Sequence, residues 1–222
     1  MGKDKLRRWA ELLTFKNVFQ PELSYPMQSH ALQGHWHEVF GNKNPIVIEL
    51  GCGRGEYTIG LAKANPDKNF IGIDIKGARL WRGAKTANDA GMANVAFLRI
   101  RIEFIHAFFA ASEIAEIWIT FPDPQLKDNR EHRRLTHQRF LEVYKQMLMP
   151  KGIIHLKSDS AELYDFTIQN LQTQAGKLLV CTPDLYNEKK LNELQQIRTT
   201  YENIFLKAGK KITYIQFQFD NL

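Results

Sequence analysis

The run Pro45-Ile46-Val47-Ile48-Glu49-Leu50-Gly51-Cys52-Gly53-Arg54-Gly55 decides the fold class of this chain of 222 residues. Residues 45–50 form a short, nearly continuous apolar segment, which predicts a strand buried on both faces of a sheet. Three glycines follow at alternate positions, where the strand passes into a helix. Glycine suits such a turn because the backbone bends tightly and a bulky ligand can approach without meeting a Cβ. We therefore expect an open α/β sheet with a ligand-binding turn after its first strand.

Strand and helix patterns alternate beyond this run. The predicted strands span residues 45–50, 70–74, 95–100, 116–121, 153–157, 178–181 and 212–219. The predicted helices span residues 56–64, 78–90, 103–110, 136–149 and 161–175, and polar stretches cover 122–133 and 184–211. Such alternation is typical of βαβ units that build a parallel sheet with right-handed crossovers.

The last predicted strand differs from the others in its pattern. Phe217 and Phe219 alternate with polar residues, which predicts a half-buried strand at the edge of the sheet. The fold prediction is therefore α/β and Rossmann-like, with a mostly parallel seven-stranded sheet, an antiparallel C-terminal edge and helices on both faces.

The first 40 residues are interpreted as an N-terminal extension, and residues 41–222 as one domain. The extension starts with a basic, aromatic-containing segment, comprising Lys3, Lys5, Arg7, Arg8 and Trp9, and continues through Pro21 and Pro26. This start is either a solvated helix or frayed terminus, or an arm that contacts nucleic acid. Trp36 and Phe40 are expected to anchor the extension against the core.

Composition narrows the function classes. The net charge of +6 favours a polyanionic partner only modestly. No apolar run approaches the roughly 18 residues of a membrane helix, and the first residues lack the apolar core of a signal peptide. Cys52 and Cys181 lie too far apart in the sequence to suggest a disulfide scaffold or a zinc site. We expect a soluble, cytoplasmic protein without a membrane or metal partner.

An acid lies where a ligand held by the glycine turn would need one. Asp74 follows Gly55 by 19 residues (74 − 55) and closes the second strand, a position suited to a ribose diol. Position 56 is Glu, so the third glycine comes one residue too early for a dinucleotide site. This spacing, preceded by Glu49, resembles the signature of class I S-adenosylmethionine-dependent methyltransferases. A turn that binds nothing and a nicotinamide or flavin site stay open as alternatives.

The segment after the fourth predicted strand carries a second acid, in Phe121-Pro122-Asp123-Pro124. Two prolines stiffen the backbone around Asp123, which suits a carboxylate held at a reaction centre. The alternative is a rigid turn in which Asp123 caps its own backbone. Four cations follow within one loop: Lys127, Arg130, Arg133 and Arg134. They form either a phosphate-binding surface for nucleic acid or a merely solvated loop, since Asp128 and Glu131 dilute the charge.

From about Leu32 to Phe219 the chain resembles the bacterial tRNA (guanine-N7-)-methyltransferase family. Five motifs occur in the order of the family pattern, at residues 49–55, 65–74, 121–134, 157–159 and 199–202. The resemblance implies transfer of a methyl group from S-adenosylmethionine to N7 of a tRNA guanosine, expected in the variable loop, with no metal.

The resemblance also implies roles for individual residues. The residues expected to bind the cofactor are Glu49, Gly51, Gly53, Gly55, Asp74 and Asp123. Asp123 is also the expected catalytic residue. The expected tRNA contacts are Lys127, Asp159, Thr199, Thr200, Tyr201 and Glu202, and the phosphate-binding interpretation of the basic loop adds Arg130, Arg133 and Arg134.

Three departures from the family pattern keep other functions open. Gln125-Leu126 replaces Trp-Pro, residues 129–134 differ from the family's basic motif, and Arg101 replaces an acid that accompanies adenine. One alternative is a non-catalytic RNA-binding module with a vestigial cofactor pocket, and another is a methyltransferase acting on a non-RNA substrate. The sequence leaves the choice between monomer and homodimer undecided.

Overall fold

The computed structural model describes residues 3–22, 28–191 and 195–219. The chain divides into two compact units, Met1–Ala110 and Ala111–Leu222. Pro26, which belongs to the predicted N-terminal extension, lies outside the described residues, as do the side chains of Lys3 and Lys5.

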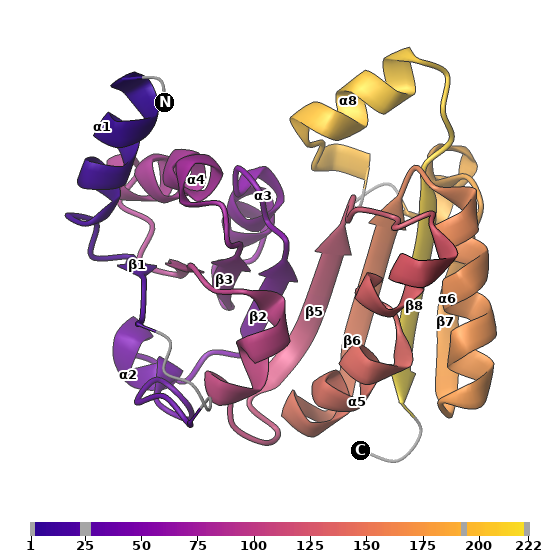
Figure 1. The fold of residues 1–222 in the computed structure, drawn as a ribbon, viewed down its shortest axis with the longest axis horizontal. Helices are drawn as coiled ribbons and strands as arrows, with labels where there is room; N and C mark the ends of the chain where they lie inside the picture. Colours follow the sequence, from indigo (N-terminus) through magenta and orange to yellow (C-terminus); the bar gives the residue numbers. More distant parts are fainter. Residues whose placement is uncertain (1–2, 23–27, 192–194, 220–222) are drawn as a thin grey trace. The chain divides into compact units, whose positions relative to one another are not determined.

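The first unit contains a parallel sheet with the strand order β1-β4-β3-β2 (Figure 1). Its elements are α1 (Lys3–Leu12), β1 (Val18–Phe19), α2 (Trp36–Phe40), β2 (Ile46–Leu50), α3 (Glu56–Ala64), β3 (Asn69–Ile73), α4 (Gly77–Asp89), β4 (Val95–Leu98) and the 3-10 helix η1 (Ile102–Ala107). Every residue of β2, β3 and β4 is buried, as their apolar sequences predict. Helix α3 contacts all three strands, which places the glycine turn between the sheet and this helix.

The N-terminal segment packs onto this unit. Helix α1 lies against α4, where the guanidinium carbon of Arg8 lies 4.8 Å from the centroid of the Trp81 ring. The Trp81 indole N–H donates to Glu11 at 3.0 Å. Strand β1, which the sequence pattern did not predict, pairs with β4 and raises the number of described strands to eight. Trp36 is fully buried, as expected of an anchor, and its indole donates to the Phe108 carbonyl at 2.9 Å.

The second unit has the strand order β5-β6-β8-β7, with β5 and β6 parallel and the other two pairings antiparallel. Its elements are β5 (Ile114–Thr120), the 3-10 helix η2 (Asp128–Arg133), α5 (Gln138–Met147), β6 (Leu148–Ser158), α6 (Ala161–Thr173), β7 (Gly176–Thr182), the 3-10 helices η3 (Leu185–Asn187) and η4 (Lys189–Leu191), α8 (Thr200–Lys207) and β8 (Thr213–Phe219). Helix α6 packs against β6, β7 and β8.

The position predicted for the last strand is wrong. β8 pairs with β6 on one side and with β7 on the other, so within this unit β7 is the outer strand. The alternation of Phe217 and Phe219 holds only at the end of β8, because residues 213–215 are all buried. Strand β7 is mostly exposed, as suits a strand with one neighbour.

Two further boundaries differ from the prediction. Helix α5 ends at Met147 and β6 begins at Leu148, whereas the sequence placed a helix to 149 and a strand from 153. Pairing with β5 passes from Leu148 directly to Ile153, so the intervening residues form a bulge, with Lys151 at a φ of 64°. The polar stretch 184–211 contains helix α8, which the hydrophobic pattern did not reveal.

Candidate functional site

The glycine turn after β2 depends on left-handed backbone conformations. Gly51, Gly53 and Gly55 have φ values of 73°, 55° and 68°, which side-chain-bearing residues rarely adopt. The Gly51 and Cys52 amides both donate to the Ile73 carbonyl, at 2.8 and 3.0 Å. These two bonds attach the turn to the carboxyl end of the neighbouring strand β3.

The three glycines differ in their surroundings. A Cβ on Gly51 would meet no atom within 4 Å, and one on Gly53 would meet only the Gly51 carbonyl at 3.9 Å. A Cβ on Gly55 would lie 2.7 Å from the Phe97 ring and 3.1 Å from Gly83 Cα. Gly51 and Gly53 therefore leave space beside the backbone, whereas Gly55 is needed for packing between the turn, β4 and α4.

Asp74 and Glu49, the two acids predicted to bind the cofactor in this unit, both accept hydrogen bonds from backbone amides. Asp74 accepts from the Gly53 amide at 2.9 Å and from the Lys76 amide at 2.7 Å. Glu49 is buried and accepts from the Thr58 amide at 2.8 Å and from the Thr58 hydroxyl. The structure therefore brings Asp74 to the glycine turn, as the sequence predicted, and directs Glu49 to the first turns of α3.

Cys52 lies within the turn but is not suited to be a nucleophile. Its side chain is buried, and desolvation, reinforced by the charges of Glu49 and Asp74, raises the pKa of the thiol well above its usual range. The reactive thiolate is therefore strongly disfavoured at neutral pH.

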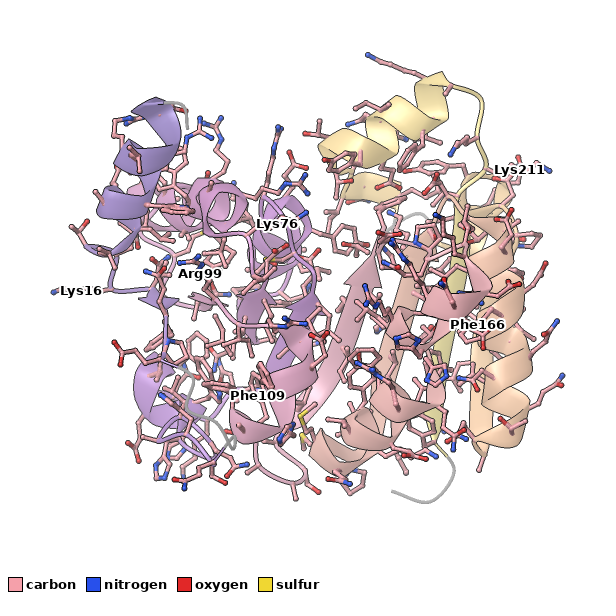
Figure 2. All side chains as sticks on the ribbon, in the orientation of Figure 1. Lys16, Lys76, Arg99, Phe109, Phe166 and Lys211 are labelled. Carbon is pink, nitrogen blue, oxygen red and sulfur yellow. The ribbon has the colours of Figure 1, made fainter. Side chains whose placement is uncertain are left out.

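The basic residue that replaces the family's adenine-side acid lies on the surface. The Arg101 side chain is 60% exposed and lies 3.3 Å from a Glu103 carboxylate oxygen. Arg99, two residues earlier, contacts the segment after β3: it donates to the Ile75 carbonyl at 3.2 Å, and a Cβ on Gly77 would approach it to 2.9 Å (Figure 2).

In the second unit, the Asp123 loop (residues 121–125) has two strained ends. Phe121 and Gln125 both have a φ of 48°, although neither is glycine. One Asp123 carboxylate oxygen accepts from the Gln125 amide at 3.0 Å, the self-capping geometry that we considered as an alternative. The Asp123 side chain is nevertheless exposed, so the turn presents this acid to solvent.

The cations of the basic loop separate into two groups. Lys127, Arg130 and Arg133 are exposed, in or next to the 3-10 helix η2. Arg134 is only 8% exposed. Three of the four predicted phosphate ligands are therefore accessible, and the fourth is enclosed by the protein.

The predicted tRNA contacts at 199–202 also separate by burial. Thr200 and Tyr201 are exposed, whereas Thr199 and Glu202 are buried. Thr199 and Glu202 form a capping box at the N-terminus of α8, in which the Glu202 amide donates to the Thr199 hydroxyl at 3.1 Å. The spacing of Thr199 and Glu202 was the signal in the sequence for helix α8.

Glu202 forms a buried ion pair that the sequence did not predict. Lys157 Nζ lies 2.7 Å from a Glu202 carboxylate oxygen, and both side chains are inaccessible to solvent. The Tyr186 hydroxyl donates to the same carboxylate at 2.8 Å. Burial lowers the pKa of Lys157, and the attraction of Glu202 opposes this shift. The pair attaches α8 to the end of β6.

Asp159, another predicted tRNA contact, lies two residues beyond Lys157. Its carboxylate accepts a hydrogen bond from the Lys210 ammonium at 2.5 Å.

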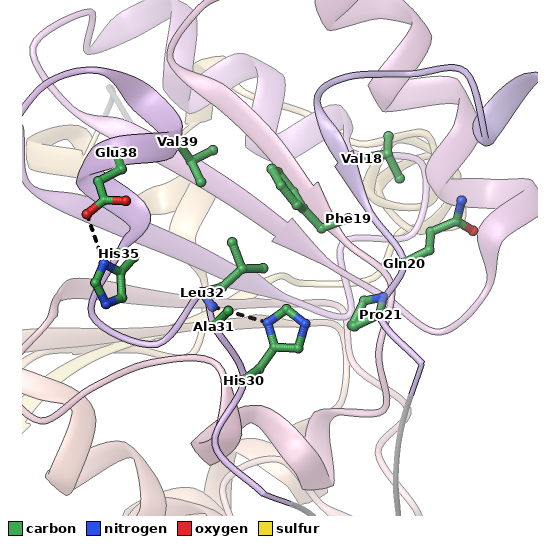
Figure 3. Close-up of a pocket in the computed structure, with 10 residues that line it drawn as sticks. All are labelled: Val18, Phe19, Gln20, Pro21, His30, Ala31, Leu32, His35, Glu38 and Val39. Carbon is green, nitrogen blue, oxygen red and sulfur yellow. Dashed lines mark hydrogen bonds and ion pairs between the residues drawn. The ribbon is translucent and has the colours of Figure 1, made fainter.

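One cavity of about 410 Å³ lies elsewhere in the first unit, between the segments 18–21 and 30–39 (Figure 3). None of the predicted site residues lines it. Two of its histidines already have partners: His30 accepts from the Leu32 amide at 3.1 Å, and a His35 ring nitrogen lies 2.9 Å from a Glu38 carboxylate oxygen.

Within residues 3–22, 28–191 and 195–219, no group of three or more His, Cys, Asp or Glu could hold a metal. The helices described there are all too short or too polar to cross a membrane.

Comparison with known proteins gives consistent matches along the chain. Residues 43–215 match the family described as "Putative methyltransferase". A tRNA (guanine-N(7)-)-methyltransferase of Christiangramia forsetii is 52% identical over 220 residues, which cover 98% of each chain. A protein of the same name from Bacteroides thetaiotaomicron is 46% identical over 220 residues, covering 98% of this chain and 86% of that protein.

Solved structures show the same fold at low sequence identity. The 16S rRNA methyltransferase KamB has a TM-score of 0.63 and 14% identity, covering 88% of this chain and 94% of that chain. An antibiotic-related methyltransferase has a TM-score of 0.61 and 18% identity, and the match covers 91% of this chain and 96% of that chain. These similarities confirm the predicted fold class, a Rossmann-like α/β class I methyltransferase.

Proposed function

Because the chain belongs to the tRNA (guanine-N(7)-)-methyltransferase family, we propose that it transfers a methyl group from S-adenosylmethionine to N7 of a guanosine in tRNA. The observation that carries the proposal is the 52% identity over nearly the whole of both chains. A variable-loop guanosine is the target that the family resemblance favours, and the cytoplasm is the compartment where we place the reaction.

The glycine turn supports the donor half of this proposal. Gly51 and Gly53 leave open space beside a left-handed backbone, which is where a bulky ligand can approach. Asp74 lies at the carboxyl end of β3 beside this turn, a position suited to a ribose diol. Gly55 and Glu49 keep the turn in place through packing and through the bonds to Thr58. These are the residues that would hold S-adenosylmethionine.

For this reaction the protein has to align the methyl group with guanine N7 and to stabilise the charge that develops on the base. Guanine N7 carries an in-plane lone pair and no proton at neutral pH, so no general base is needed. When bound, S-adenosylmethionine supplies an electrophilic methyl group on a sulfonium. Positive charge develops on the imidazole ring of the guanine, and a carboxylate can stabilise it. We assign this role to Asp123, which is exposed and flanked by prolines, together with hydrogen bonds from the guanine N1 and N2 edge.

The accessible cations and α8 residues are the proposed tRNA contacts. Lys127, Arg130 and Arg133 present their charge to solvent and are assigned to phosphates. Exposed Thr200 and Tyr201 are assigned to direct contact with the tRNA, whereas buried Thr199 and Glu202 act by shaping α8. Phosphate contacts offset the cost of moving the target base out of its stack, which is on the order of a few kcal/mol.

The substitution Asp123→Ala tests this assignment. We expect turnover to fall about a hundredfold or more, the effect of losing a key electrostatic group. S-adenosylmethionine binding, measured by isothermal titration, should be retained at least in part. Asp128→Ala, which removes another exposed acid from the following segment, is the matched control and should leave the rate within about twofold. Near-normal activity of Asp123→Ala would remove Asp123 from the mechanism.

Two measurements on the wild-type protein separate the alternatives. Nucleoside analysis of tRNA incubated with labelled S-adenosylmethionine should show 7-methylguanosine. A methyltransferase with a non-RNA substrate would bind the donor without labelling tRNA. A non-catalytic RNA-binding module would give no heat of binding with S-adenosylmethionine.

A further inference from the structure

Arg134 differs from the other cations of the basic loop by its burial. Its side chain is 10% exposed, whereas its neighbour Arg133 is exposed. A guanidinium that binds a nucleic-acid phosphate has to reach the surface, so burial is the first indication of another role.

The partners of Arg134 give the second indication. Its Nε donates to the Pro124 carbonyl at 3.1 Å, and Nη2 donates to the Gln125 carbonyl at 3.4 Å. The third guanidinium nitrogen, Nη1, lies 3.5 Å from a Glu131 carboxylate oxygen. Its guanidinium carbon lies 4.3 Å from the centroid of the Phe166 ring of α6, which Figure 2 labels. A planar, forked cation can bridge two successive carbonyls and stack on a ring at once, which an ammonium cannot do.

The two carbonyls belong to the strained end of the Asp123 loop. Gln125 has a φ of 48°, a conformation that costs a residue with a side chain about 1–3 kcal/mol and persists only when surrounding contacts hold it. The Gln125 amide in turn donates to Asp123 Oδ1 at 3.0 Å. A continuous set of bonds therefore runs from Arg134, through the Gln125 backbone, to the carboxylate that we assign to catalysis.

We propose that Arg134 is a positioning residue, which fixes the orientation of the Asp123 carboxylate by holding the Pro124 and Gln125 carbonyls, and that it binds no tRNA phosphate. This inference rests on the proposed function, because it acts through the catalytic role assigned to Asp123. It divides the basic loop into three cations that bind tRNA and one that organises the reaction centre.

The test compares Arg134→Met with Arg133→Met, adjacent substitutions that each remove one positive charge. For Arg133→Met we expect weaker tRNA binding, with the slope of log K against log salt concentration reduced in magnitude by about one. For Arg134→Met we expect the salt slope of the wild type and a kcat lower by about tenfold or more, because misplaced catalytic groups lose rate steeply. The dissociation constant for S-adenosylmethionine should stay within about twofold in both variants.

Two further variants distinguish positioning from a general loss of structure. Arg134→Lys keeps the charge but loses the planar fork, so kcat should fall as in Arg134→Met. Gln125→Gly relieves the left-handed strain and, combined with Arg134→Met, should recover part of kcat. If Arg134→Met fails to fold, Phe166→Leu replaces it; removal of the stacking ring should lower kcat without changing the salt slope.

The outcomes separate this inference from the proposed function. A salt slope reduced by about one in Arg134→Met would assign Arg134 to phosphate binding. Full activity of Arg134→Lys would show that the planar fork is not needed. Either result would overturn the inference while the wild-type enzyme stays active. Absence of tRNA methylation by the wild-type protein would overturn the proposed function itself, and the inference with it.

Discussion

The glycine turn and the Asp123 loop both follow the carboxyl end of a buried parallel strand, but they reach their conformations differently. The glycine turn adopts positive φ at three glycines, where this conformation costs little. The Asp123 loop adopts positive φ at Phe121 and Gln125, where it is strained. The first loop is therefore allowed by its own composition, whereas the second needs support from other segments.

The supports of the Asp123 loop come from two directions. At one end, the Phe121 amide donates to the Lys157 carbonyl of β6 at 2.8 Å, and the Phe121 ring lies 5.8 Å from that of Phe205 on α8. At the other end, Arg134 holds the Pro124 and Gln125 carbonyls. The comparison predicts that substitutions far from Asp123 in the sequence disturb its loop. The glycine turn depends less on such support, because its glycines adopt their backbone conformation without strain.

The largest expected effect comes from breaking the buried Lys157–Glu202 pair. Lys157→Met leaves the Glu202 carboxylate buried without its cation, which destabilises a protein by about 3–5 kcal/mol. Urea unfolding measures this loss, and turnover of the remaining folded enzyme should fall as well, because α8 no longer fixes Phe205 against Phe121.

The double variant Lys157→Met/Glu202→Leu is the control for this prediction. Removing both charges also removes the unpaired carboxylate, so more than half of the lost stability should return. If the double variant is less stable than Lys157→Met, the destabilisation arises from lost packing instead of an unpaired buried charge.

A smaller effect is expected from adding a methyl group to the glycine turn. Gly55→Ala combines a left-handed backbone with a Cβ placed 2.7 Å from the Phe97 ring. We expect a loss of about 2–4 kcal/mol, the sum of the conformational and the overpacking costs. S-adenosylmethionine binding should weaken in parallel, which isothermal titration measures.

Gly91→Ala is matched to this change, because Gly91 has a φ of 62° but a Cβ at this position would meet no atom within 4 Å. It should lose only the conformational cost, about 1 kcal/mol, and should keep donor binding. Equal losses in the two variants would show that the methyl group added at position 55 meets no steric conflict with Phe97.

The smallest effect concerns the thiol inside the glycine turn. Because the pKa of Cys52 is raised in the folded state, the contribution of the neutral thiol to stability is complete below its ordinary pKa of 9.0 and is lost as the pH rises further. The free energy of unfolding of the wild type should therefore fall more steeply above pH 9 than that of Cys52→Ala, by up to about 1.4 kcal/mol per pH unit.

Thiol labelling at pH 8 provides a second measurement of the same feature. Cys181 is exposed and should react with an aromatic disulfide reagent, whereas Cys52 should react only after unfolding. Cys181→Ser should abolish the fast phase. A fast phase that persists in this variant would contradict the burial of Cys52.

Local patterns were sufficient to predict most of the sheet and the glycine turn. The strands around residues 46–50, 69–73 and 95–98 are continuous apolar runs, and the turn after the first of them consists of glycines at fixed spacing. These signals depend on neighbouring residues alone, so a single sequence contains them. The same holds for α8, because the spacing of Thr199 and Glu202 in the sequence already indicates a capping box at its N-terminus.

The sequence by itself determined the α/β class, the acid that meets the glycine turn and the motifs that resemble the family. Only the tertiary structure decided which cations are accessible, that β8 lies between β6 and β7, and that Lys157 pairs with Glu202. The physical reason is that strand order and burial arise from contacts between segments distant in the chain. Arg133 and Arg134 are identical in type and adjacent in the sequence, and only the position of Pro124, Gln125 and Phe166 around one of them makes their environments different.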